Sequence, residues 1–183
     1  MLQRGCGPPA TTGGLVRVFL TGASGYLGRS VAADLRAAGH QVQPCEVRLA
    51  QLPPRSIHAD AVVHLAAYTR GNPAFPATLH TAEEIRLSNL DGTACLLAAL
   101  AGRPRLLYVS SRAVYGAGWP QRTLTEEAPL EATDVYGRSK IDAERLIRDS
   151  ALEHAILRIT NLYGVRHGHA GRSFANVMIE RIW

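Results

Sequence analysis

The chain has 183 residues and a formal net charge of +5, and its composition, 46% hydrophobic and 19% charged, is that of an ordinary globular domain. All but one of its 20 Lys and Arg residues are Arg, scattered without a basic run, which argues against a nucleic-acid-binding tract. It contains no apolar stretch long enough to span a membrane, and its three cysteines lack metal-ligand spacing. We therefore expect a cytoplasmic protein with no nucleic-acid, membrane or metal partner.

The first predicted elements surround a glycine-rich loop. Residues 1–14 are rich in Gly, Pro and Thr, which predicts a flexible tail before a single domain over 15–183. A strand is predicted at 15–20 and a helix at 25–39. Between them, Gly22 would permit a tight turn, Gly25 would let the backbone approach a pyrophosphate, and Gly28 would let helix and strand pack closely. The pattern predicts a dinucleotide-binding loop; the alternative is a glycine-rich turn without a ligand.

The next predicted strand, 40–47, carries an acidic residue near its end. Glu46 lies 18 residues after Gly28, where an acid binds the ribose hydroxyls of NAD. This favours NAD over NADP, although Arg29 and Arg48 are near enough to leave the choice open. Only 14 residues separate Glu46 from Ala61, barely one crossover connection. We therefore expect the outer strand of this half of the sheet to be missing or vestigial.

Strand and helix then alternate to the end of the chain. Strands are predicted at 59–67, 105–111 and 154–160, and helices at 81–102, 135–151 and 173–182. A capping box of Thr81 and Glu84 begins the long helix, and Gly102 is its expected end. The alternation predicts an α/β fold of the Rossmann type, a doubly wound parallel sheet with helices on both faces.

The only lysine of the chain, Lys140, lies four residues after Tyr136 on a predicted helix. Residues four apart share one helix face, so both side chains can enter one site. A nearby ammonium lowers the pKa of a tyrosine, which can then exchange a proton with a substrate hydroxyl or carbonyl. A compact ammonium also suits a ribose hydroxyl better than the guanidinium used elsewhere in this chain. A solvated helix face is the alternative interpretation.

Six ordered motifs resemble those of the extended short-chain dehydrogenase/reductase family, the NAD-dependent epimerases and dehydratases of nucleotide sugars. They are TGASGYLG (21–28), VVHLAA (62–67), NLDGTACLL (89–97), VSSRAVYG (109–116), YGRSK (136–140) and LRITNLYG (157–164). The resemblance implies hydride transfer at a sugar carbon with NAD as cofactor, and NADP is the alternative. It also implies a homodimer formed through the helices around 81–102 and 135–151.

The resemblance assigns roles to individual residues. Tyr136 would be the acid/base, Lys140 would bind the nicotinamide ribose, and Ser111 rather than Ser110 would hydrogen-bond the reacting group. Asn161 would contact the nucleotide portion of the substrate, and Asn89 would be structural. The implied cofactor contacts are Gly22, Gly25, Tyr26, Leu27, Gly28, Glu46, Leu65, Ala66, Ala67, Tyr136 and Lys140.

The sequence departs from the family pattern in three places. Arg112 and Ala113 replace the acidic pair that follows the catalytic Ser/Thr of dehydratases, which leaves epimerisation or keto-reduction. The short interval after Glu46 removes a loop that contacts adenine in the family. The chain ends soon after the strand at 154–160, so most of the substrate domain is expected to be absent. The alternative function is a catalytically inactive relative that only binds the dinucleotide.

Overall fold

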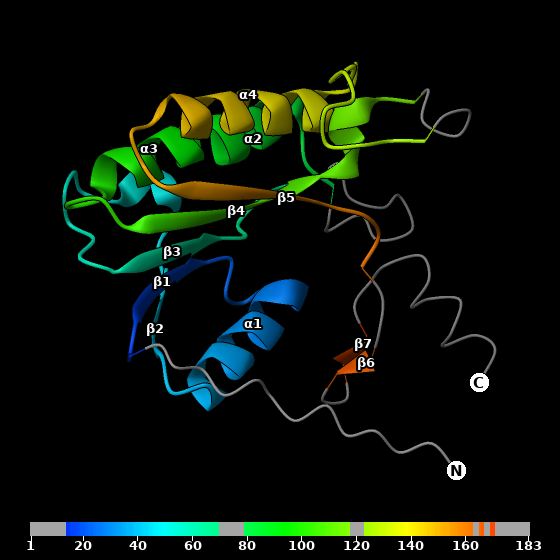
Figure 1. The fold of residues 1–183 in the computed structure, drawn as a ribbon. Helices are drawn as coiled ribbons and strands as arrows, with labels where there is room; N and C mark the ends of the chain where they lie inside the picture. The colour runs from blue at the N-terminus through cyan, green and yellow to red at the C-terminus, as the bar shows by residue number, and fades with distance from the viewer. Residues whose placement is uncertain (1–13, 70–78, 118–122, 163–164, 167–168, 171–183) are drawn as a thin grey trace, which may run out of the picture.

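Five parallel strands form the central sheet. The computed structural model describes residues 14–69, 79–117, 123–162, 165–166 and 169–170. The strand order is β2-β1-β3-β4-β5 (Figure 1), with β1 (Arg17–Thr21), β2 (Gln41–Pro44), β3 (Ala61–His64), β4 (Arg105–Ser111) and β5 (His154–Ile159). A separate antiparallel pair joins β6 (Val165–Arg166) to β7 (His169–Ala170). The predicted α/β class and parallel sheet are confirmed.

Helices cover the two faces unequally. Below the sheet in Figure 1 lies α1 (Tyr26–Ala37), and above it lie α2 (Ala82–Arg86), α3 (Gly92–Ala99) and α4 (Val135–Asp149). Short 3₁₀ turns, η1 (Leu49–Gln51) and η4 (Arg112–Tyr115), follow β2 and β4. The predicted helix at 173–182 and nearly all of the predicted tail lie outside the described residues.

The missing outer strand is confirmed. Strand β2 lies at the edge of the sheet, and only η1 interrupts the connection from β2 to β3. An edge position also explains how β2 tolerates Pro44, which has no backbone N–H to donate to a further strand. The short connection therefore leaves β2 without the helix and outer strand that usually follow it.

The long predicted helix of 81–102 is a helical segment in three parts that ends earlier. Thr81 and Glu84 form the expected capping box, with the Thr81 N–H donating to Glu84 Oε2 at 2.7 Å. A π-helical turn, η3 (Leu87–Asp91), separates α2 from α3. The last helical carbonyls are taken by the β2–β3 connection, because the N–H of Ile57 donates to the Ala99 carbonyl at 2.9 Å. A tertiary contact therefore ends the helix before Gly102.

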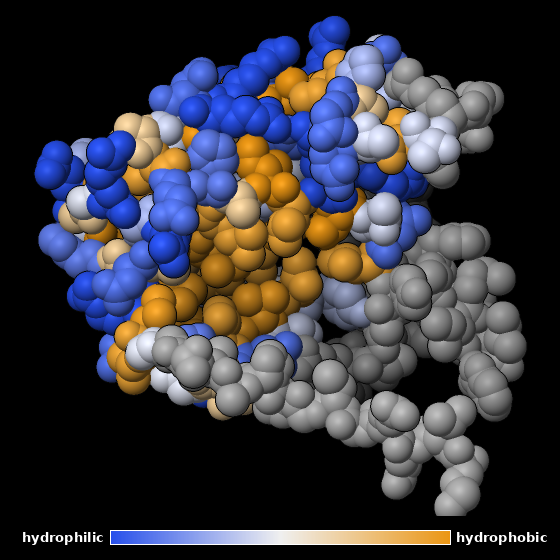
Figure 2. Space-filling view, viewed as in Figure 1, coloured by the Kyte–Doolittle hydropathy of each residue, from blue (hydrophilic) through white to orange (hydrophobic). Residues whose placement is uncertain are grey.

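Two apolar cores lie on opposite faces of the sheet. The larger lies under α3 and α4, and the smaller packs strand residues such as Leu20 against α1. Figure 2 shows apolar side chains gathered below α4, on the side of the molecule that β5 borders, where Leu157 is 46% exposed. None of the described helices is long and apolar enough to cross a membrane.

Candidate active site

The glycine loop forms a turn in which two glycines have no room for a side chain. Gly22 has φ +71°, and a Cβ there would lie 2.7 Å from the Ala66 nitrogen. A Cβ on Gly28 would lie 2.0 Å from the Gly22 carbonyl oxygen. The first turn of α1 therefore packs directly on the end of β1, as the sequence predicts. Its N-cap, Gly25, is exposed, and no side chain caps this end of the helix.

No role was predicted for His64, which the structure buries at the end of β3. Thr93 Oγ1 donates its one proton to the Asn89 carbonyl at 2.6 Å, so His64 Nε2 must be the donor in its 3.0 Å contact with Thr93 Oγ1. His64 Nδ1 is then an acceptor and receives the Thr21 hydroxyl proton at 2.7 Å. The hydrogen bonds thus define one neutral tautomer. Burial and the nearby Lys140 ammonium lower the pKa of His64 to about 3.

Thr21 connects this histidine to the segment that follows β3. Its hydroxyl oxygen accepts hydrogen bonds from the N–H groups of Leu65 at 3.2 Å and Ala66 at 3.1 Å. Leu65 and Ala66 are the residues whose backbone lies against Gly22. The hydrogen bonds of Thr21 therefore fix the shape of two predicted cofactor-binding segments at once. A buried polar residue inside the apolar run VVHLAA was the only local signal for this arrangement.

Asn89 joins the same network to helix α4. Its amide oxygen accepts from the Tyr68 N–H at 2.7 Å, and its amide nitrogen donates to the Tyr68 carbonyl and to Ser139 Oγ. Ser139 in turn donates to the carbonyl of Tyr136 at 2.7 Å. Asn89 is 1% exposed, which agrees with the structural role that the resemblance implies. A continuous path of hydrogen bonds thus runs from the glycine loop to the helix of the predicted acid/base.

The Ser111 hydroxyl lies close enough to Tyr136 to act on the pKa of the tyrosine hydroxyl. Asp134 begins α4, and its carboxylate accepts from the Tyr136 N–H at 3.0 Å and the Gly137 N–H at 3.1 Å. Ser110 is turned to the other face of β4, where its hydroxyl donates to the buried carboxylate of Glu144 at 2.6 Å. This geometry favours Ser111 over Ser110 as the residue that contacts a reacting group.

Lys140 shares the helix face of Tyr136 but is more enclosed than the sequence suggests. It is 2% exposed, and its ammonium donates to the Val109 carbonyl at 2.9 Å and lies 4.6 Å from the centre of the Tyr108 ring. Burial lowers the pKa of Lys140 to about 8, against the opposing charge of Glu144. The amine is therefore mostly cationic at neutral pH and loses its charge in mildly alkaline solution.

The expected lowering of the tyrosine pKa is not seen. Burial raises the pKa of the Tyr136 hydroxyl, the hydrogen bond with Ser111 acts in the opposite direction, and the Asp134 carboxylate adds to the rise. Lys140 is bonded to Val109 instead of the tyrosine hydroxyl, which explains why its charge has no such effect here. Tyr136 is thus held in its protonated form, ready to donate a proton.

A cavity of about 420 Å³ opens between the glycine loop, the β2–β3 connection and the start of the α2–α3 segment. Gly22 and Ala66, two of the predicted cofactor contacts, line it, and the stacked rings of Tyr68 and His80, 3.9 Å apart, form part of its wall. The other lining residues are Thr21, Cys45, Val47, Arg48, Leu49, Ala50, Glu84, Leu87, Ser88, Asp91 and Gly92. Tyr68 and His80 lie in segments on either side of residues 70–78, so no local sequence pattern predicted their contact.

Other predicted site residues lie outside this lining. Glu46 is exposed and absent from the lining, although Arg48, two residues on, is part of it. Tyr26 and Leu27 begin α1, and Tyr26 is 37% exposed. Asn161 lies at an exposed position just after β5. Within the described part of the chain, no group of three or more metal-ligating side chains comes together.

We expect His64 to make the protein sensitive to mild acid. The unfolded chain binds a proton on this histidine near pH 6.5, but the folded chain does so only near pH 3, so stability falls as the pH drops through that interval. Between about pH 7 and about pH 5 the free energy of unfolding should fall by about 2 kcal/mol from this group. Urea denaturation at the two pH values measures it.

Two variants assign this acid sensitivity to His64. His64→Gln should be less stable than the parent at neutral pH but should lose most of the dependence on pH. His58→Gln, which replaces an exposed histidine, should retain it. An unchanged pH dependence in His64→Gln would show that other groups cause the acid sensitivity.

Comparison with known proteins places these observations in a family. Residues 18–183 match the family model described as the NAD dependent epimerase/dehydratase family. A curated relative from Streptomyces antibioticus, a probable dTDP-4,6-dihydroxy-2-methyloxan-3-one 4-ketoreductase, is 31% identical over 181 residues. That alignment covers 91% of this chain and 57% of the relative. The chain therefore spans little more than half the length of this relative.

Solved structures with bound cofactors share the fold. A short-chain dehydrogenase/reductase superfamily protein from Agrobacterium tumefaciens with bound NAD aligns with a TM-score of 0.65 and 29% identity, over 78% of this chain and 48% of that one. RMD from Pseudomonas aeruginosa, complexed with NADPH, aligns with a TM-score of 0.61 and 30% identity, over 82% of this chain and 54% of that one.

Proposed function

Because this chain belongs to the NAD dependent epimerase/dehydratase family, we propose that it binds NAD or NADP and supports hydride transfer at a sugar carbon of a nucleotide sugar. The observation that carries the proposal is that Tyr136, on the same helix face as buried Lys140, lies near Ser111 at the end of β4. One of the similar structures has bound NAD and the other has bound NADPH. Together they support a nicotinamide dinucleotide as the cofactor without selecting between the two.

The residues of the glycine loop fit a bound dinucleotide. Side chains are excluded at Gly22 and Gly28, so only backbone is present at these two positions of the turn. The uncapped start of α1 can then direct N–H groups to a pyrophosphate. The cavity lined by Cys45, Val47 and Arg48 would take the adenosine end. Because Arg48 lines this cavity and Glu46 does not, the structure gives less support to an NAD preference than the sequence did.

The catalytic residues would manage the proton while the nicotinamide, when bound, supplies or accepts the hydride. Tyr136 would donate a proton to a substrate carbonyl oxygen in reduction, or remove one from a hydroxyl in oxidation. Ser111 would hold that same oxygen by a hydrogen bond, and Lys140 would bind the nicotinamide ribose. With its raised pKa, Tyr136 is protonated in the state that the structure shows, which is the form that keto-reduction requires.

Four finer assignments stay proposals. Arg112 and Ala113 follow Ser111 in η4, where a dehydratase of the resembled family would have acidic residues, so we favour epimerase or ketoreductase chemistry. The 4-ketoreductase relative supports the same choice. The homodimer expected through α2, α3 and α4, the cytoplasmic location and the substrate contact of Asn161 remain predictions from the resemblance.

Calorimetric titration of the 183-residue chain with NAD, and separately with NADP, tests the proposal. We expect at least one of them to bind, and Arg48→Gln to weaken NADP more than NAD if the 2′-phosphate lies near that side chain. Binding without turnover of any nucleotide 4-keto-sugar would support the alternative of an inactive dinucleotide-binding relative. If neither cofactor binds, the dinucleotide site is not functional in this chain and the proposal fails for it.

A further inference from the structure

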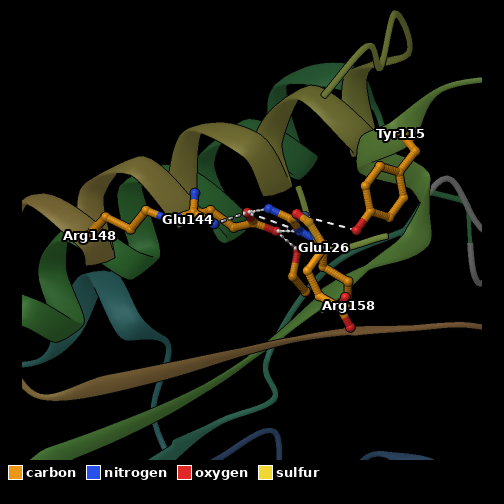
Figure 3. Close-up of polar contacts among 6 residues, drawn as sticks. Tyr115, Glu126, Glu144, Arg148 and Arg158 are labelled. Atoms are coloured by element: carbon orange, nitrogen blue, oxygen red, sulfur yellow. Dashed lines mark hydrogen bonds and ion pairs between the residues drawn. The ribbon is translucent and has the colours of Figure 1, made fainter. Parts of the chain in front are cut away.

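A buried ion-pair cluster lies next to the proposed catalytic residues and has no role in the reaction described above. It consists of Glu144 on α4, Arg158 on β5, Ser110 at the end of β4, and Arg148 on α4, with Tyr115 on η4 and the Glu126 carbonyl (Figure 3). Buried charges are costly unless they are fully paired, so such a cluster calls for an explanation.

Glu144 is fully paired. The carboxylate has no exposed surface and accepts from Ser110 Oγ at 2.6 Å, from Arg158 Nε at 3.0 Å and Nη2 at 2.8 Å, and from Arg148 Nη2 at 3.0 Å. Burial alone would raise the pKa of Glu144, but the hydrogen bonds from Arg158 and Ser110 and the charges of the two arginines outweigh it. The residue is therefore a fixed anion inside the protein.

Arg158 extends the cluster to the turn after β4. While its Nε and Nη2 contact Glu144, its Nη1 donates to the Tyr115 hydroxyl at 2.9 Å and to the Glu126 carbonyl at 2.8 Å. The guanidinium also lies 5.1 Å from the centre of the Tyr115 ring. One side chain thus joins β5, η4, the 123–130 segment and, through Glu144, helix α4. Only the planar, multiply donating head of arginine can make all of these contacts together.

Two of the three proposed catalytic residues, Ser111 and Lys140, have a close neighbour in the cluster. Ser110 precedes Ser111 in β4, and Glu144 lies one helical turn after Lys140. The 3₁₀ turn that begins after Ser111 ends at Tyr115. The cluster therefore holds β4 and η4, which carry Ser111, against α4, which carries Tyr136 and Lys140.

We propose that Glu144 is a positioning residue for the reaction: its carboxylate, locked by Arg158 and Ser110, fixes α4 against the end of β4 and is the counter-charge that keeps buried Lys140 cationic. The proposal rests on the proposed function for its role in catalysis. The charged and titratable groups around Lys140 are His64 on β3, Tyr108 on β4, and Tyr136 and Glu144 on α4. Of these, Glu144 is the one held as an anion, so its removal should lower the pKa of Lys140.

Lys140 can be observed directly because it is the only lysine of the chain. Lysine labelled with ¹³C at Cε gives one NMR signal, whose shift against pH reports the pKa of this amine. We expect the parent to titrate near pH 8. Glu144→Gln should lower this pKa by about one pH unit, the size of effect that one nearby charge produces. Asp142→Asn, which removes an exposed acid from the same helix and its ion pair with Arg145, should leave it unchanged.

A second variant separates an effect on Lys140 from a loss of folding. Glu144→Gln leaves Arg158 buried without its counter-ion, whereas the double variant Glu144→Gln/Arg158→Gln leaves no unpaired charge. Because Glu144 is the charge that acts on Lys140, the double variant should also lower the pKa. Equal Lys140 pKa values in the parent and the folded variants would overturn the proposal. Failure of both variants to fold would also overturn it, because the pair would then be a requirement of the fold.

This titration needs no cofactor, so its failure is distinct from that of the proposed function. A chain that binds neither NAD nor NADP would still show whether Glu144 controls the charge of Lys140. If the chain binds cofactor but the pKa of Lys140 does not depend on Glu144, the proposed function stands and the positioning role of Glu144 is refuted.

Discussion

Replacing Gly28 with alanine is expected to abolish dinucleotide binding. The new methyl group would lie 2.0 Å from the Gly22 carbonyl oxygen, 2.7 Å from the Gly22 carbonyl carbon and 2.8 Å from the Ala23 Cα. All three are backbone atoms of the turn itself, so the methyl fits only if α1 and the turn separate. That separation moves the N–H groups away from the pyrophosphate position. Calorimetric titration with NAD or NADP should show no binding.

Gly39→Ala is the matched control for that experiment. Gly39 follows the other end of α1, and a Cβ there would meet nothing within 4 Å. Its φ of +87° makes alanine strained, at a cost of about 1 kcal/mol in stability. We expect Gly39→Ala to bind cofactor like the parent despite this loss. Parent-like affinity in Gly28→Ala would show that the glycine turn does not hold the dinucleotide.

Tyr136→Phe is expected to reduce turnover by about 10²- to 10⁴-fold and to leave cofactor affinity nearly unchanged. The substitution removes the Tyr136 hydroxyl. Among the described residues, no other hydroxyl lies beside Ser111 and on the helix face of Lys140. The phenyl ring keeps the packing, so the glycine turn and the cavity should be unaffected. The measurement is oxidation of the reduced cofactor with a nucleotide 4-keto-sugar, together with calorimetric titration of the cofactor.

Tyr108→Phe provides the comparison for the loss of a tyrosine hydroxyl. Tyr108 is 1% exposed, and its hydroxyl has no hydrogen-bond partner among the residues that the structure describes. The phenylalanine ring would remain beneath Lys140, so turnover should stay close to that of the parent. A Tyr136→Phe variant as active as Tyr108→Phe would refute the acid/base assignment.

Local chemistry in the sequence accounts for most of the predicted elements and for the glycine turn. The run at 105–111 and the Thr81–Glu84 capping box are formed as predicted, because strand burial and helix capping depend on neighbouring residues. The absence of the outer strand was predicted from the length of the β2–β3 connection alone, because the residues between Glu46 and Ala61 allow only one crossover. The end of the long helix was predicted wrongly, because the N–H groups of Arg55 and Ile57, more than 40 residues away, donate to its last carbonyl groups.

The sequence by itself determined the α/β class, the family and the spacing that places Tyr136 and Lys140 on one helix face. The tertiary structure decided their electrostatics. Lys140 is bonded to the Val109 carbonyl, and burial raises the pKa of Tyr136, contrary to the lowering expected from spacing. The structure also revealed the Glu144–Arg158 pair between α4 and β5. Spacing along a helix determines which side chains share a face. A pKa also depends on burial and on charges from distant segments, which only the folded chain brings together.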